Sequence, residues 1–313
     1  MEFEKPIVEM EKAVEKLKNI SNENKGDFSA QLAELEQKLS ERKKQIYDNL
    51  SAFQTVQVAR HPQRPVFQDY ISLIFSDFVE LHGDRCFGDD YAMIGGFAML
   101  GKEKVMIIGH NKGKNVEENI KRNFGMARPE GYRKALRLMK LAQKFNVPVL
   151  TFVDTSGAYP GADAEERGQA EAIARNLTEM ATIEVPIITV ITGEGGSGGA
   201  LGIAVADSIL MLSHSIYSVI SPEGCAGILW RDASFAPNAA EALKITAKSL
   251  LELGVIDEII PEPVGGAHTN PAQTAENVKE CLLKQIKKLA SLSTSKLLAK
   301  RFEKYAAMGK FNK

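Results

Sequence analysis

The sequence predicts an α/β fold with a mostly parallel β-sheet, and three features support this prediction. Short apolar runs rich in β-branched residues recur along the middle of the chain, and their lack of polar alternation is typical of strands buried on both faces. Helical stretches separate these runs, as the right-handed crossovers between parallel strands require. The 313 residues are 44% hydrophobic, which is enough for a sizeable core.

Composition and charge exclude several classes of protein. The 39 Lys and Arg nearly balance the 40 Asp and Glu, so no global field attracts nucleic acid or an anionic membrane. No apolar run approaches the ~18 to 20 residues of a transmembrane helix, and the charged start of the chain does not resemble a secretory signal. Cys86, Cys225 and Cys281 fit neither a disulfide framework nor a metal-ligand spacing. We therefore predict a cytoplasmic protein without a structural metal.

The N-terminal region, residues 1–58, is predicted to form a helical hairpin. Apolar residues recur three and four positions apart on both sides of the polar stretch 21–26. They are Ile7, Met10, Val14 and Leu17 before the stretch, and Leu32, Leu35, Leu39 and Ile46 after it. Such a helix pair either caps the core or docks a partner subunit, and its pattern leaves both uses open. Two prolines within residues 59–65 end this region.

Residues 59–265 are predicted to form the α/β core, followed by C-terminal helices over 266–313. The expected strands are 105–109, 149–153, 187–191, 209–212 and 217–220. Helices are expected over 129–145 and 164–180. This alternation of strand and helix is the pattern of consecutive crossover units.

A glycine-rich segment, Gly193 to Gly202, follows the strand 187–191 and precedes the helix-compatible stretch 200–206. Glycine lets a ligand approach the main chain closely, and the start of a helix presents unpaired N–H groups. The segment therefore predicts an anion or oxyanion site built from backbone amides. Tight packing of a helix on a strand is the alternative explanation for these glycines.

A second junction of this kind lies at Asp154 to Gly161, directly after the strand 149–153. The carboxyl ends of parallel strands meet at one edge of a sheet, where ligands collect. Either Gly157 or Ala158 from this loop, with Gly195 or Gly196 from the other, is placed to donate two N–H groups to one oxygen. The pair of loops predicts an oxyanion hole.

Two other functions remain open at this point. Residues 195–199 match the G-x-S-x-G pattern of serine hydrolases with Ser197 as nucleophile, and Asp232 or Asp257 and then His268 follow in the chain order of the α/β-hydrolase triad. A non-catalytic scaffold that recruits partners through its helical hairpin is the other alternative. No phosphate-binding loop or dinucleotide fingerprint is present, so nucleotide binding is unsupported.

Residues 111–140 carry a local excess of positive charge. Nine Lys and Arg stand against three Glu, a surplus of six. Such a stretch binds a phosphate-bearing ligand or an acidic partner, or forms a solvated helical face, and the sequence does not separate these uses.

Six segments together resemble the carboxyltransferase alpha subunits of bacterial acetyl-CoA carboxylases. They are ARHPQRP (59–65), RNFGMARPEGYRKALRLM (122–139), FVDTSGAYPGADAEERGQ (152–169), ITGEGGSGGALGI (191–203), YSVISPEGCAGILW (217–230) and IIPEPVGGAH (259–268). Their order and their spread over nearly the whole chain make the resemblance specific. It implies a crotonase-like (ClpP/crotonase) fold, a spiral of ββα units, with the N-terminal hairpin and C-terminal helices added.

The resemblance also implies a reaction and partners. Alpha subunits of this family work with a zinc-binding beta subunit in an alpha2beta2 assembly and transfer a carboxyl group from carboxybiotin to acetyl-CoA. The product, malonyl-CoA, serves fatty acid synthesis. Carboxybiotin is presented by the biotin carboxyl carrier protein after biotin carboxylase has charged it. The resemblance implies no cofactor bound covalently in this chain, and zinc only in the beta subunit.

Site residues follow from the same resemblance. Negative charge builds on the thioester oxygen and on the biotin ureido oxygen, so one oxyanion hole per subunit is expected. The implied amide donors are Gly195 and Gly196 with Gly157 and Ala158 opposite, Tyr159 and Ser197 are implied on the biotin side, and Arg122 and Arg128 are candidates for the CoA phosphates. The family's loop reads DTPGAYPG, whereas Ser156 stands here in place of the first proline, so a fixed φ is lost.

Overall fold

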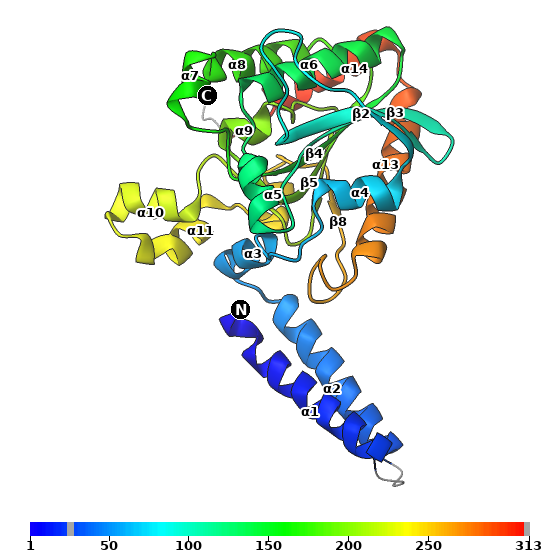
Figure 1. Cartoon of the computed structure of the whole chain (residues 1–313), viewed down its shortest axis with the longest axis vertical. Helices are drawn as coiled ribbons and strands as arrows, with labels where there is room; N and C mark the ends of the chain where they lie inside the picture. Colours follow the sequence, from blue (N-terminus) through cyan, green and yellow to red (C-terminus); the bar gives the residue numbers. More distant parts are fainter. Residues whose placement is uncertain (24–27, 310–313) are drawn as a thin grey trace.

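A computed structural model describes residues 1–23 and 28–309. Within them a mixed sheet of eight strands forms the centre of the molecule (Figure 1), in the order β1-β2-β3-β4-β5-β6-β8, with β7 paired to β5. The strands are β1 Ser76–Glu80, β2 Met93–Leu100, β3 Glu103–His110, β4 Val149–Thr155, β5 Ile187–Gly196, β6 Ser208–Leu212, β7 Ile216–Ser218 and β8 Glu258–Ile260.

The parallel part of the sheet confirms the α/β prediction. β3, β4, β5, β6 and β8 run parallel, and β4 and β6 are buried at every position. The sequence did not predict β1 and β2, which add an antiparallel edge next to β3, nor the short β8. β1 is mostly exposed and β2 contains two glycines, so neither has the continuous apolar run that identified the central strands.

The described residues form fourteen α-helices, several of which cover the two faces of the sheet (Figure 1). They are α1 Lys5–Glu23, α2 Ser29–Tyr47, α3 Ala52–Ala59, α4 Phe67–Ile74, α5 Val116–Lys121, α6 Pro129–Lys144, α7 Ala162–Glu166, α8 Gln169–Met180, α9 Ser197–Leu201, α10 Pro222–Trp230, α11 Ala236–Leu243, α12 Ala247–Glu252, α13 Pro271–Ala290 and α14 Thr294–Ala306. α6, α8 and α14 lie on one side of the sheet, and α4 and α13 lie on the other (Figure 1).

The two faces of the sheet bury separate hydrophobic cores. Val149 and Val153 of β4 pack in the core under α6 and α8, while Leu150 and Phe152 pack in the core under α4 and α13. Successive residues of a strand point to opposite faces, so a strand between two helical layers is apolar throughout. This explains why the central strands were the clearest features of the sequence.

The N-terminal helices α1 and α2 form the predicted hairpin, which extends away from the core (Figure 1). Ion pairs join the two helices, including Lys43 to Glu11 at 2.7 Å. Positions 24–26 of the predicted polar break lie outside the described residues. The following helix, α3, was assigned to the N-terminal region up to residue 58, yet it packs on the core through Val56 and Ala59.

Two predicted helices differ from the structure. The expected helix 164–180 is interrupted by Gly168, whose φ of 83° is left-handed, and it forms α7 and α8 instead. The expected helical stretch 200–206 is the short α9, which begins earlier and ends at Leu201. No helix of the described chain is long and apolar enough to cross a membrane.

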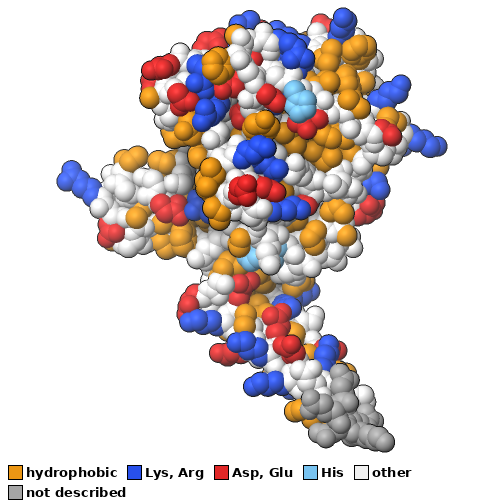
Figure 2. Space-filling view, in the orientation of Figure 1, with side chains coloured by type: hydrophobic (Ala, Val, Ile, Leu, Met, Phe, Trp, Pro, Cys, Tyr) orange, Lys and Arg blue, Asp and Glu red, His pale blue; other side chains and the backbone are white. Residues whose placement is uncertain are grey.

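α10 and α11 project from the body as a separate lobe (Figure 1). Large apolar side chains are exposed on it (Figure 2), with Ile228 72% and Leu229 64% accessible. Exposed apolar side chains that lie together are typical of surfaces that bind other proteins.

Candidate active site

The two glycine loops meet at the carboxyl ends of β4 and β5. These strands are parallel neighbours, and Thr155 pairs with Gly195 in the ladder. A Cβ on Gly196 would lie 2.1 Å from the Ser156 carbonyl oxygen, and a Cβ on Gly199 would lie 2.3 Å from the Gly157 carbonyl carbon. The loops are therefore in direct backbone contact, which only glycine at 196 and 199 permits. The structure brings the loops together as the sequence predicted.

The candidate amide donors differ in their surroundings. The Gly157 N–H donates to Thr155 Oγ1 at 3.2 Å, and that hydroxyl donates to the Gly157 carbonyl at 2.7 Å. In the part of the chain that the structure describes, the Ala158 N–H has no hydrogen-bond acceptor. Gly195 is buried in β5, and Gly196 is partly exposed at its end. Ala158 and Gly196 thus lie where the two loops reach the surface.

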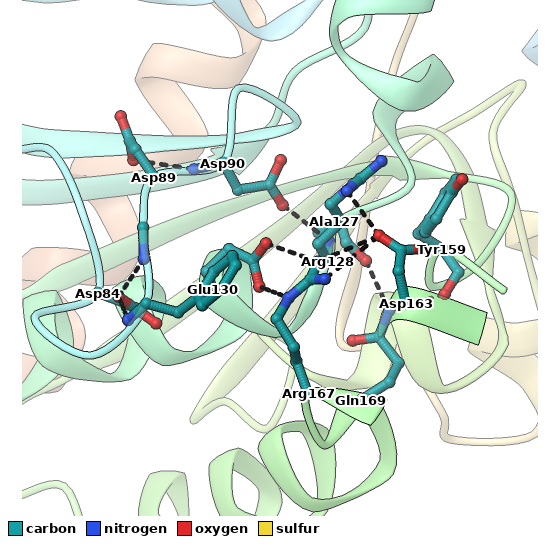
Figure 3. A network of polar contacts seen from close by, with 12 residues as sticks. Asp84, Asp89, Asp90, Ala127, Arg128, Glu130, Tyr159, Asp163, Arg167 and Gln169 are labelled. Atoms are coloured by element: carbon teal, nitrogen blue, oxygen red, sulfur yellow. Dashed lines mark hydrogen bonds and ion pairs between the residues drawn. The ribbon is translucent and has the colours of Figure 1, made fainter. Parts of the chain in front are cut away.

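The first loop is held at Tyr159 by three contacts (Figure 3). The Tyr159 N–H donates to the Ala127 carbonyl at 3.0 Å, and its carbonyl accepts from Gln169 Nε2 at 2.9 Å. The Arg128 guanidinium lies 4.5 Å from the centre of the Tyr159 ring and donates to Asp163 at 2.9 Å. Arg128 was implied to contact CoA phosphates; the structure gives it partners within the chain, and phosphate binding stays a prediction.

A network of carboxylates surrounds the start of α6 (Figure 3). Glu130 pairs with Arg167 at 3.0 Å. Burial raises the pKa of Asp90 to about 6, although its carboxylate accepts from the Arg128 N–H at 2.7 Å. Burial also acts to raise the pKa of Asp89, but the hydrogen bonds from Lys134, the Gly83 N–H and His82, with the charge of Lys134, together outweigh it and lower the pKa to about 2. Carboxylates of the chain itself therefore neutralise much of the basic stretch.

A cavity of about 430 Å³ opens beside the first loop. Its wall includes Asp154, Ser156 and Glu194, at the carboxyl ends of β4 and β5. Lys112 donates to Asp154 at 2.6 Å, and Arg122, the other candidate for CoA phosphates, donates to the Lys112 carbonyl at 3.0 Å. Both cations have intrachain partners, so the sequence overestimated the free positive charge at this edge.

The structure does not assemble the hydrolase triad around Ser197. Ser197 has a left-handed φ of 53° and borders a largely apolar cavity of about 360 Å³ with Tyr217. The His268 ring stacks on His61 with centroids 3.7 Å apart. Asp257 accepts from a main-chain amide of β6 and pairs with α14, and Asp232 caps the short turn before α11. Each proposed partner of Ser197 is engaged elsewhere.

Sequence reasoning missed two side-chain amides that hold the loops. They are Gln169, which contacts Tyr159, and Asn176, which donates to the carbonyls of Tyr132 and Gly202 at 2.9 Å each. Asn176 is 1% exposed and lies four residues from both Ala172 and Met180, which are buried. The sequence signal for Asn176 was a polar residue on the apolar face of a helix. A buried amide requires hydrogen-bond partners, so such a residue indicates a polar contact in the core.

The fold defines the class of structure first: an α/β core with two glycine loops at the carboxyl ends of neighbouring parallel strands is a crotonase-like fold. The structure is similar to transcarboxylase 12S, with a TM-score of 0.55 at 19% identity over 79% of this chain and 42% of that one. It is also similar to a chain of a Pseudomonas malonate decarboxylase hetero-tetramer, with a TM-score of 0.58 at 16% identity. That match covers 71% of this chain and 89% of the other. At these identities the likeness shows the fold alone.

The family follows from sequence comparison. Residues 1–309 match the model of the acetyl co-enzyme A carboxylase carboxyltransferase-like family. The acetyl-coenzyme A carboxylase carboxyl transferase subunit alpha of Geobacter metallireducens is 57% identical over 99% of this chain and 98% of its own length. The corresponding subunit of Bacillus cytotoxicus is 56% identical over 99% of this chain and 95% of its own length. The chain belongs to this family of carboxyltransferase alpha subunits, which are enzymes of the transferase class.

Proposed function

We propose that this chain, with a beta subunit, transfers the carboxyl group of carboxybiotin to acetyl-CoA to form malonyl-CoA, and that its two glycine loops stabilise the negative oxygen that develops. The backbone contact between the loops supports this proposal, since Gly196 lies against Ser156 and Gly199 lies against the Ala158 nitrogen at the carboxyl ends of β4 and β5. Among the described residues the Ala158 N–H has no acceptor, so it is a donor open to a ligand.

The chemistry needs hydrogen-bond donors rather than a side-chain base. When the C–N bond of carboxybiotin breaks, CO₂ leaves and negative charge moves onto the ureido group. That group then takes a methyl proton of acetyl-CoA, and the resulting enolate carbon attacks CO₂, so protons and electrons balance. Donors about 2.7–3.1 Å from the charged oxygen lower the barrier, because the charge is larger in the transition state than in the substrate. We assign the ureido oxygen to the loops of this chain and the enolate oxygen to the beta subunit.

The proposed partners follow from the same family. A zinc-bearing beta subunit, the biotin carboxyl carrier protein and biotin carboxylase complete the enzyme, which we expect to be a cytoplasmic alpha2beta2 assembly feeding fatty acid synthesis. The exposed apolar side chains of α10 provide a surface of the kind that subunit contacts bury. Sedimentation of the co-purified subunits tests the stoichiometry, and the chain alone should show no carboxyltransferase activity.

Replacement of single peptide N–H groups by ester oxygens tests the amide donors. A side chain at 196 would collide with the Ser156 carbonyl, so ordinary substitutions confuse donor loss with displacement of the loop. Glycolate at position 196 and L-lactate at position 158 each replace one N–H by an ester oxygen without changing the side chain, and the accompanying weakening of the preceding carbonyl as an acceptor is shared by the control below. We expect kcat of the assembled complex to fall by about 10²–10³ with little change in KM.

Glycolate at Gly101, in the turn between β2 and β3, is the matched control and should leave kcat unchanged. If the esters at 158 and 196 also leave kcat unchanged, the oxyanion proposal is wrong. Ser197→Ala separates the carboxyltransferase from the hydrolase alternative. A carboxyltransferase should keep most of its activity in this variant, whereas a serine hydrolase should lose nearly all of its activity.

A further inference from the structure

We propose that α8 sets the distance between the two glycine loops, and that Gln169 and Asn176 are the positioning residues through which it does so. The inference rests on the oxyanion function proposed above. The carboxamide nitrogen of each residue donates to two main-chain carbonyls. One carbonyl lies in α6 or just before it, and the other lies next to one of the glycine loops.

Gln169 holds the first loop. Its Nε2 donates to the Ala127 carbonyl and to the Tyr159 carbonyl, at 2.9 Å each. The Tyr159 N–H also donates to the Ala127 carbonyl, so both main-chain polar groups of Tyr159, the residue after Ala158, are held by hydrogen bonds. Figure 3 shows Gln169 reaching from the start of α8 toward Ala127, beside Tyr159. The Ala158 N–H is one residue away from this anchor.

Asn176 holds the second loop in the same manner. Its Nδ2 donates to the Tyr132 carbonyl in α6 and to the Gly202 carbonyl at the end of α9, at 2.9 Å each. The Tyr132 hydroxyl adds a bond to the Gly199 carbonyl at 3.1 Å. α9, which follows Gly196 directly, is thus held at its end by Asn176 and at Gly199 by Tyr132.

The two amides act as one device because they lie on the same face of one helix. They are seven residues apart, which is close to two helical turns and about 10.5 Å along the axis. α6 receives a bond from each, at Ala127 just before its start and at Tyr132 within it. Two helices joined at two points fix the relative position of the loops more tightly than the first loop does by itself, because Ser156 lacks the fixed φ of the proline that the family has there.

A primary amide suits this position because it donates twice without carrying a charge. Its nitrogen carries two N–H groups and so serves two carbonyl oxygens at once, whereas a carboxylate has no donor and would repel both. All four contacts are to carbonyl oxygens, so the nitrogen end of each side chain must face them. A side chain that only filled space would not need this arrangement.

The test uses Gln169→Met, Gln169→Glu, Asn176→Leu and the double variant Gln169→Met/Asn176→Leu in the reconstituted alpha–beta complex. We expect each single variant to lower kcat by about 10–100-fold with KM for both substrates unchanged, because misplaced donors fail in the transition state and not in substrate binding. Gln169→Glu, which keeps the size but not the donors, should be at least as impaired as Gln169→Met. The kcat of the double variant should lie within a few-fold of that of the less active single variant, because loss of either side chain already lets the distance between the loops change.

Gln285→Met is the matched control, because Gln285 on α13 donates its amide to Glu258 at 2.8 Å and is buried away from the loops. It should keep the wild-type kcat. If Gln169→Glu equals wild type, or if the single variants keep kcat per assembled complex, the positioning role is wrong.

The backbone esters separate this failure from failure of the proposed function. Wild-type kcat in the α8 variants together with loss of activity in the Ala158 ester refutes only the role of α8. Wild-type kcat in both refutes the oxyanion site as well. If Asn176→Leu does not assemble, the Gln169 variants decide, because Gln169 lies at the partly exposed first turn of α8.

Discussion

Loss of the buried ion pair between Arg64 and Glu262 should destabilise the core without touching the glycine loops. Arg64 binds Glu262 through both terminal nitrogens, at 3.0 and 2.6 Å, and the two side chains are 3% and 0% exposed. Arg64 Nε also donates to the Thr192 carbonyl of β5 at 2.7 Å. Burial acts to raise the pKa of Glu262, but Arg64 and His214 hold it well below its usual range.

Arg64→Met removes the cation and leaves the carboxylate buried without a counter-charge. Breaking such a pair costs about 3–5 kcal/mol. With about 2.1 cal/mol/K of unfolding entropy per residue, the 313 residues give about 0.7 kcal/mol/K, so the melting temperature should fall by about 4–7 °C. Without Arg64, burial raises the pKa of Glu262 in the variant, so its unpaired carboxylate takes up a proton as pH falls toward the unfolded pKa and the deficit of the variant should shrink in acid.

Differential scanning calorimetry at pH 7 and pH 4.5 measures this effect. Arg175→Met is the matched control, since Arg175 meets Glu171 at 3.8 Å with both side chains about 60% exposed, and it should shift the melting temperature by less than about 1 °C. Arg64→Met/Glu262→Gln should recover part of the loss, because no unpaired charge stays buried. A melting temperature for Arg64→Met equal to that of the control, or a double variant less stable than Arg64→Met, would refute the reasoning.

Two further predictions concern the loops and acid stability. Gly199→Ala places a Cβ 2.3 Å from the Gly157 carbonyl carbon, so the first loop must move and kcat should fall by about 100-fold or more, while Gly88→Ala, with no atom within 4 Å of its Cβ, keeps activity in the same assay. Burial, with the nearby His61 and Arg64, lowers the pKa of His268 to about 4. Its neutral form is favoured in the fold, so it contributes stability above about pH 6.5 that is lost as pH falls toward 4. His268→Gln should therefore show a smaller drop in melting temperature between these pH values, and an identical drop contradicts this account.

The sequence predicted the buried half of the fold better than its edges. β4 and β5 carry apolar residues on both faces, so their runs of Val and Ile identified them without any neighbour. β1 depends on pairing with β2, and the break between α7 and α8 depends on the backbone of Gly168. Features fixed by tertiary contacts, or by one φ value, leave no periodic signal.

The charged residues show the same limit. The nine basic residues over 111–140 left several uses open, from anion binding to a solvated helical face, and in the structure Lys112, Arg128 and Lys134 pair with carboxylates 35–45 positions away in the chain. Ion pairs across such separations form only when the chain folds. A short stretch of sequence shows the basic residues but not the distant carboxylates that neutralise them.

The candidate site shows why glycine motifs reveal where a site lies but not how its geometry is fixed. Glycines at 196 and 199 are readable in the sequence because only they allow the loops to touch. The distance between the loops is fixed elsewhere, by two amides of α8 that bond main-chain oxygens and leave only a polar residue on an apolar face. A site made of backbone N–H groups has no side chain of its own to adjust its geometry. Its accuracy must come from side chains that grip the backbone nearby, and Gln169 and Asn176 are therefore where a search for lost activity should begin.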